Sequence, residues 1–132
     1  MKIISFAWTT PALLAGRKTC TRRDWDERYA QSFKASEMVQ AYDKSPRVGG
    51  KKVAVIKLVG TPILTDMMPA DDYDAEGLKW MEEQEIMVPV TDVKSKRKLP
   101  MHPRRFWEAW LATRFPMWLV RFELVNISTT NV

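Results

Sequence analysis

The chain has 132 residues, the length of one domain, and its single cysteine, Cys20, excludes an intramolecular disulfide and a cysteine-based zinc site. Its apolar content of 45% and charged content of 28% are typical of a globular protein, and no apolar run is long enough to span a membrane. The net charge of +5 favours an anionic partner. We therefore expect one cytoplasmic domain over residues 1–132.

The charge is divided between two segments. Residues 94–105, KSKRKLPMHPRR, hold six basic residues and no acid, whereas residues 66–85 hold eight acids and one lysine. A basic segment attracts a polyanion, and an acidic segment nearby limits how tightly the polyanion is held.

The first elements come in the order strand, helix, turn. Residues 2–8 are rich in β-branched and aromatic side chains and predict a strand. Thr10 before Pro11 predicts the start of a short helix, and Gly16 predicts its end. The basic stretch GRKTCTRR, residues 16–23, therefore begins in the turn that leaves this helix.

A second helix and two strands are expected next. Asp24 and Glu27 resemble a capping box, and aromatic side chains at four-residue spacing predict a helix over residues 25–34. Residues 37–43 and 51–59 are predicted strands, separated by turn-forming residues.

The second half of the chain contains more helix and one more strand. Residues 70–85 predict a helix that breaks at Gly77, and residues 89–101 are polar and aperiodic, which predicts a long loop. Pro103 can open a last helix. Residues 117–127 place Trp118, Val120, Phe122 and Leu124 on one face and predict a final strand.

Strands and short helices thus mix irregularly along the chain, unlike the regular alternation that builds a parallel α/β sheet. The predicted fold class is α+β: a small, mainly antiparallel sheet or barrel with helices packed around it.

The stretch ALLAGRKTCTRR, residues 12–23, resembles the motif that defines ASCH domains. That motif is a short helix followed by Gly, any residue, Lys-Thr, any residue, Thr, any residue and Arg. The resemblance extends over the chain, because the preceding strand, the later strand pair, the segment Ala75-Glu76-Gly77 and the aromatic closing strand follow the family's order. It implies a PUA-like fold, a small mainly antiparallel β-barrel with flanking helices, formed here as a single ASCH domain.

The chain departs from the family's pattern in two places. Residues 35–37, Ala-Ser-Glu, stand where the family often has a Gly-Asp turn, and the basic segment 94–105 is longer than compact members need. Neither departure touches the motif, but the second affects which ligand is preferred.

The resemblance leaves three functions open. ASCH domains are proposed to bind RNA in a cleft beside the motif, some compact bacterial members are amidohydrolases of N4-acetylcytidine and related nucleosides, and a ribonuclease activity also occurs in the family. By motif position, the catalytic lysine and threonine of the amidohydrolases match Lys18 and Thr21. Their glutamate matches Glu76 through a short Glu-Gly-Leu alignment, and the arginine matches Arg23. No cofactor is implied.

The residue types suit this chemistry. A threonine hydroxyl becomes a nucleophile when a base takes its proton, and lysine is such a base only when neutral. Because the ordinary pKa of lysine is about 10.4, burial and nearby positive charge are needed, and Arg17, Arg22 and Arg23 would supply that charge. Glu76 would orient the amine or pass a proton to the departing nitrogen, and Arg23 would hold the oxyanion. An ordinary surface carboxylate near a helix end is an equal alternative for Glu76.

Further residues are candidates for contact with RNA or a modified nucleoside. Trp8 and Trp118 could stack on a base, whereas Trp107 and Trp110, at helical spacing, are expected in the core. His102 has no partner ligand nearby in the sequence, so no metal site is predicted. The candidate phosphate-binding side chains are basic: Arg17, Arg22, Arg23, Lys96, Arg97, Lys98, Arg104 and Arg105.

Overall fold

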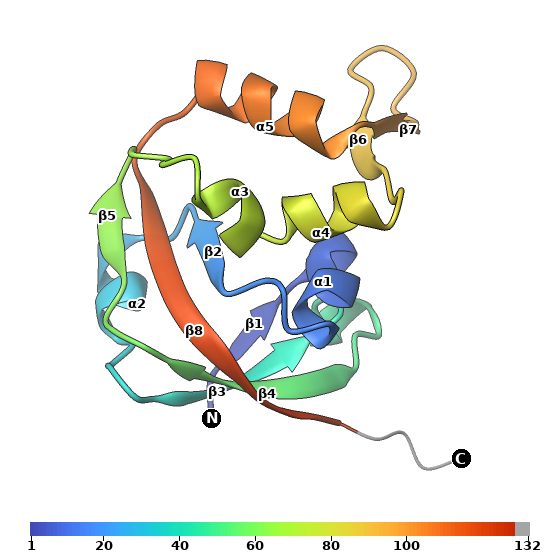
Figure 1. Ribbon diagram of the computed structural model, residues 1–132. Helices are drawn as coiled ribbons and strands as arrows, with labels where there is room; N and C mark the ends of the chain where they lie inside the picture. Colours follow the sequence, from blue (N-terminus) through green and yellow to red (C-terminus); the bar gives the residue numbers. More distant parts are fainter. Residues whose placement is uncertain (129–132) are drawn as a thin grey trace.

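A curled, six-stranded sheet is the frame of the computed structural model, which describes residues 1–128. Every strand pair in the sheet is antiparallel except β1 with β3, so the expected α+β class with a mainly antiparallel sheet is confirmed (Figure 1). The strands run in the order β1 (Ile3–Ser5), β3 (Met38–Tyr42), β4 (Lys52–Leu58), β8 (Met117–Ile127) and β2 (Cys20–Arg23), with β5 (Ile63–Thr65) also paired to β8.

The long strand β8 joins the two parts of the sheet. Its first half pairs with β2 and β5, and its second half pairs with β4. Trp118, Val120 and Phe122 alternate along it and are buried, as the apolar alternation of the sequence predicts. The register places Thr21 opposite Val120, which fixes the motif strand β2 on the frame.

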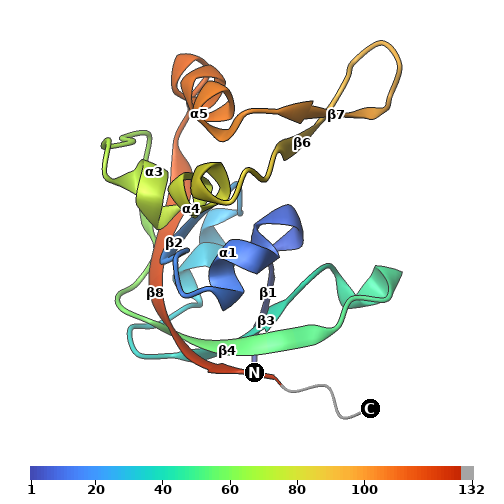
Figure 2. The same cartoon turned by 45° about the vertical axis from the view of Figure 1, so that its right-hand side comes forward.

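The buried apolar side chains form two separate clusters. One fills the curl of the sheet and includes Phe6, Leu13, Phe33, Ile56 and Phe122. The other lies between the helices α3 (Asp72–Ala75), α4 (Leu78–Glu83) and α5 (Pro103–Ala112), and its buried members are Tyr73, Leu78, Met81, Val88 and Trp107. Each such side chain contributes about 1.5–3 kcal/mol by leaving water. Figures 1 and 2 show α5 stacked above α4, on the side away from β3 and β4.

The first helix is short, as predicted, whereas the second is shorter than its sequence pattern suggests. A 3₁₀ turn, η1 (Ala7–Thr9), leads into α1 (Thr10–Leu14), which Gly16 follows at a φ of +75°, as a glycine after a helix end allows. The helix α2 (Glu27–Gln31) begins later than predicted, because its cap is Asp26, which accepts from Tyr29 N at 2.9 Å, and not Asp24. A second 3₁₀ turn, η2 (Pro46–Val48), lies between β3 and β4.

The prediction of a long loop over residues 89–101 is wrong. The segment is a hairpin of β6 (Val88–Thr91) and β7 (Lys98–Met101), in which Pro89 lies opposite Pro100. Prolines are tolerated there because both strands of a two-stranded ribbon are edges, where a missing N–H costs little. The tip is closed by Asp92, whose carboxylate accepts from Ser95 N at 2.8 Å. The polar and aperiodic sequence of the segment gave it the pattern of a loop.

The break predicted at Gly77 is confirmed, and the last helix begins at Pro103 as expected. Gly77 separates α3 from α4 at a φ of +92°. His102 caps α5, since its Nδ1 accepts from Arg104 N at 3.1 Å. None of the helices in residues 1–128 has the length and apolar character needed to cross a membrane.

Candidate functional site

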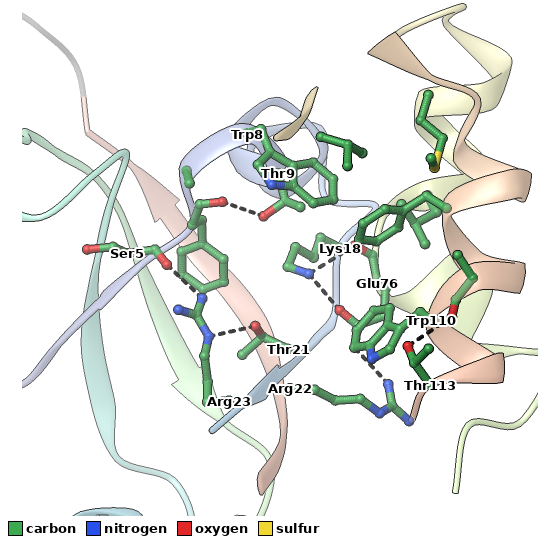
Figure 3. Close-up of a pocket in the computed structure, with 17 residues that line it drawn as sticks. Ser5, Trp8, Thr9, Lys18, Thr21, Arg22, Arg23, Glu76, Trp110 and Thr113 are labelled. Atoms are coloured by element: carbon green, nitrogen blue, oxygen red, sulfur yellow. Dashed lines mark hydrogen bonds and ion pairs between the residues drawn. The ribbon is translucent and has the colours of Figure 1, made fainter. Parts of the chain in front are cut away.

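A pocket of about 560 Å³ opens between the sheet frame and the helix α5. Its floor is made by side chains of the motif and of the α3–α4 segment, and its roof by aromatic side chains of η1 and α5 (Figure 3). The two buried clusters therefore meet at this pocket, and the functional candidates of the sequence lie where they meet.

Lys18 and Glu76 form a buried ion pair at the floor. Lys18 Nζ donates to Glu76 Oε1 and to the Glu76 carbonyl, both at 2.9 Å, and each residue is 4% exposed. The backbone brings them together, because Lys18 N bonds the Ala12 carbonyl and Thr19 N bonds the Ala75 carbonyl. Glu76 is thus a buried side chain of the pocket and not the surface carboxylate that was the alternative.

Arg22 joins the same buried network. Its Nη1 donates to Glu76 Oε2 at 2.7 Å, and its Nη2 bonds Asp72 Oδ2. Burial opposes the charge on Arg22, but the bond to Asp72 and the nearby Glu76 outweigh burial and raise the pKa of Arg22. Asp72 in turn binds Arg121, at 3.0 Å from Oδ1 to Nη2. Two carboxylates therefore compensate the buried Lys18 and Arg22.

Thr21 and Arg23 occupy the other side of the floor. Arg23 Nε donates to Thr21 Oγ1 at 2.9 Å, and its Nη2 donates to the Ser5 carbonyl at 2.6 Å. Within residues 1–128 no carboxylate pairs with Arg23, and burial lowers its pKa. Arg23 thus brings an uncompensated cation next to the Thr21 hydroxyl, where a developing negative charge would be stabilised.

The roof is aromatic and apolar. Trp8 meets Phe106 edge to face at a centroid distance of 5.3 Å, and Phe106 lies 5.9 Å from Trp110. Val90 of β6 and Met101 of β7 also line the pocket. Sequence reasoning placed Trp8 at the site but missed these four other side chains. It was right that Trp107 is buried in the core, but Trp110, three residues further along α5, lines the pocket instead.

No family model matches the chain, and no curated protein matches it. Among solved structures, the chain is similar to the crystal structure of protein EF3133 from Enterococcus faecalis V583, described with the family model DUF984. The TM-score is 0.52 at 18% sequence identity, and the match covers 97% of this chain and 78% of that one. At this identity the likeness shows the fold alone, a small α+β domain with a curled, mainly antiparallel sheet.

The remaining motif cation, Arg17, points away from the pocket. It binds Asp74 at 3.1 Å and Glu83 at 2.9 Å. The acidic segment 66–85 therefore lies against the basic motif and supplies the partners of Lys18, Arg17 and Arg22. Two of the three arginines expected to place positive charge beside Lys18 are compensated by these carboxylates.

The other binding candidates lie outside the pocket lining. Trp118 is buried in β8 at 9% exposure. Arg104 stacks on Tyr73, with Cζ 3.9 Å from the ring centroid, and lies 3.7 Å from Glu82. Arg105 is exposed on α5, and three more candidates are exposed on the hairpin: Lys96, Arg97 and Lys98.

A reactive cysteine and a metal ion are two other sources of chemistry that the described residues could have provided. Cys20 is fully buried, and burial raises the pKa of its thiol, so it stays protonated and unreactive. Over residues 1–128, His, Cys, Asp and Glu side chains do not gather in any group of three that could hold a metal ion.

Proposed function

We propose that this chain is an ASCH domain of the PUA-like superfamily and that its pocket hydrolyses the N4-acyl amide of cytidine-type nucleosides. The observation that carries the proposal is the convergence of Lys18, Thr21 and Glu76 on one pocket. These residues lie up to 58 positions apart in the chain, yet all are about 4% exposed and face the same space. Buried polar groups gathered in a pocket are typical of functional sites.

The pocket has the size and polarity that this substrate class needs. Its volume of about 560 Å³ lies in the range of small-molecule sites. A flat pyrimidine ring would lie against the aromatic roof at Trp8 and Trp110, since rings stack on aromatic side chains. The acyl amide would then face the polar floor, beside Thr21 and Arg23.

The reaction follows from the groups at the floor. Within the Lys18–Glu76 pair, Glu76 takes a proton from Lys18, and the neutral amine then takes the hydroxyl proton as Thr21 Oγ1 forms a bond to the amide carbon and Arg23 stabilises the oxyanion. The carbon–nitrogen bond then breaks, and the departing N4 receives a proton by way of Lys18 and Glu76, which gives cytidine. Water hydrolyses the resulting acyl ester and releases the carboxylic acid, which restores the Thr21 hydroxyl.

The test is incubation of the purified protein with N4-acetylcytidine, with cytidine release followed by chromatography. Thr21→Ala should lower kcat on the order of a thousandfold or more, because it removes the nucleophile. Thr19→Ala is the matched control: it makes the same change two residues away, on an exposed side chain, and should leave kcat unchanged. Equal activity of Thr21→Ala and the wild type would contradict the assignment of the nucleophile.

A second candidate function is RNA binding without hydrolysis of an amide, and the hairpin favours it. Its tip and the first residue of β7 carry the exposed Lys94, Lys96, Arg97 and Lys98, while its strands contribute Val90 and Met101 to the pocket lining. Figure 2 shows the hairpin extending outward from the end of α5. A single-stranded RNA could lie with its phosphates along the hairpin and one base in the pocket. The same arrangement would serve a ribonuclease.

Salt dependence tests this candidate. If four hairpin cations meet phosphates of a single strand, log affinity for an oligoribonucleotide should fall with log salt at a slope of about −3. Replacing Lys96, Arg97 and Lys98 with Gln should reduce that slope to about −1. A wild-type slope near zero would contradict the candidate. Shortening of the oligonucleotide on a gel would identify a ribonuclease.

A further inference from the structure

A chain of alternating charges runs from the surface to the pocket floor. Arg121 Nη2 lies 3.0 Å from Asp72 Oδ1, Asp72 bonds Arg22, Arg22 Nη1 lies 2.7 Å from Glu76 Oε2, and Glu76 Oε1 lies 2.9 Å from Lys18 Nζ. The four inner side chains are 2–5% exposed, whereas the Arg121 side chain is 44% exposed. Only the outer end of the chain therefore meets solvent.

Each carboxylate in this chain is shared between two cations. Asp72 lies between Arg121 and Arg22, and Glu76 lies between Arg22 and Lys18. Both oxygens of Glu76 are occupied, one by each neighbour, so the plane of this carboxylate is fixed from two sides. Figure 3 shows the Lys18 amine bonded to Glu76 and directed into the pocket.

Arg22 depends on Asp72 for its placement. Its Nη2 also donates to the Met67 carbonyl at 3.1 Å, but its buried Nε has no hydrogen-bond partner among the described residues. Within residues 1–128 its carboxylate partners are Asp72 and Glu76. If the charge of Asp72 were removed, Glu76 would be the one carboxylate left for both Arg22 and Lys18.

A buried ion network is a poor device for stability alone, because desolvation of the charges offsets most of their attraction. A fixed geometry is the better explanation of four charges held away from water. We propose that Asp72 and Arg22 are positioning residues, which hold Glu76 so that its Oε1 keeps the Lys18 amine beside Thr21. The proposal rests on the hydrolysis proposed above, in which Lys18 takes the Thr21 proton.

The test is Asp72→Asn, which keeps the shape of the side chain and removes its charge. We expect kcat for N4-acetylcytidine to fall about tenfold or more while KM stays within about twofold, because the change acts through Lys18 and not on substrate binding. Asp72→Glu restores the charge and should recover part of kcat. Rates are expressed per folded protein, with the folded fraction taken from thermal unfolding, so that a loss of stability alone does not change them.

Asp74→Asn is the matched control. It makes the same change on the same helix, but Asp74 binds Arg17 outside the pocket, and its side chain is 48% exposed. We expect it to keep the wild-type kcat. Wild-type kcat in folded Asp72→Asn would overturn the proposal, as would an equal loss in both variants.

If Asp72→Asn does not fold, Arg121→Gln removes the outer cation instead. A fall in kcat of about threefold is then expected, and an unchanged kcat overturns the proposal.

A second measurement separates this proposal from the proposed function. If the wild type releases no cytidine, the hydrolysis is wrong, and crystal structures of the wild type and Asp72→Asn still report on the network. A Glu76 carboxylate that leaves Lys18 and turns to Arg22 in the variant supports the positioning role. A carboxylate that keeps both contacts overturns it.

Discussion

The floor and the roof of the pocket differ in how their side chains are held. At the floor, Lys18, Arg22 and Glu76 are buried and joined by ion pairs of 2.7–2.9 Å. At the roof, Trp8 and Trp110 are half-buried and contact their neighbours through ring edges and faces. The contacts at the floor therefore depend on the direction of each ion pair, whereas those at the roof depend on the apolar area in contact.

This difference predicts how the two regions respond to change. A buried charge that loses its partner is left uncompensated, so a floor substitution affects chemistry and folding together. Apolar contact is not directional, so a roof substitution changes affinity roughly with the area removed. The hairpin strands that supply Val90 and Met101 belong to this second, more tolerant region.

The two tryptophans of α5 test the role of the roof and carry the largest expected loss of stability. Trp107→Ala removes a side chain that is 4% exposed in the second cluster and should lower the free energy of unfolding by about 3–5 kcal/mol. Trp110→Ala should cost less stability but weaken binding of cytidine by about 1–3 kcal/mol, because it removes a stacking surface. Urea denaturation and titration calorimetry measure the two quantities.

These variants serve as controls for each other, because both make the same change on one helix. If Trp110→Ala binds cytidine like the wild type, Trp110 takes no part in recognition. If Trp107→Ala weakens binding after correction for the unfolded fraction, the second cluster and the pocket are coupled and the division between core and roof is wrong.

Much of the floor could be predicted from the sequence, because its motif is local. Lys18, Thr21 and Arg23 lie within one turn and strand, and the resemblance of this stretch to the ASCH motif singled them out as candidates. The partners could not be predicted in the same way. Asp72 reaches Arg22, and Arg121 reaches Asp72, only through the register of β2 with β8 and the packing of α3, which are properties of the tertiary structure.

The roof was missed for a different reason. Helical spacing of Trp107 and Trp110 shows that both lie toward one side of α5, but it does not show whether that side meets a core or a cavity. The hairpin was missed because residues 89–101 are polar and aperiodic, and its paired Pro89 and Pro100 are tolerated only because both strands are edges. The order of most strands and helices was predictable, since periodicity and turn residues are local signals.

Gly77 lies between the pocket floor and the second cluster, and its substitution is expected to cause the next largest loss of stability. A Cβ there would lie 2.7 Å from Ala12 Cβ and 3.3 Å from Lys18 Cβ, at a φ of +92°. Gly77→Ala should therefore lower the free energy of unfolding by about 2–4 kcal/mol, from left-handed strain and overpacking together. Urea denaturation measures this loss.

Gly16→Ala separates the two causes. Gly16 has a φ of +75°, but a Cβ there would meet nothing within 4 Å, so only strain of about 1–2 kcal/mol is expected. Equal losses in the free energy of unfolding at both glycines would show that the added Cβ at Gly77 fits beside Ala12 and Lys18 at no further cost. The floor would then be less tightly packed than these distances indicate.

A half-buried ion pair, between Lys2 and Glu37, sharpens the contrast with the buried floor and carries the smallest expected effect. Lys2 Nζ lies 2.8 Å from Glu37 Oε2, and their side chains are 31% and 23% exposed. Burial acts to raise the pKa of Glu37, but hydrogen bonds from Lys2 Nζ and Lys34 N outweigh it and lower that pKa. The stabilisation is therefore complete above the unfolded pKa of about 4.3 and is lost as the pH falls through the folded value.

Glu37→Gln should lower the free energy of unfolding by about 0.2–1 kcal/mol at neutral pH and leave it unchanged in acid, where Glu37 is protonated. Urea denaturation at both pH values measures this. A cost that persists in acid would mean that Glu37 acts there through shape and hydrogen bonding, as a neutral side chain, and that its charge is not what stabilises the fold.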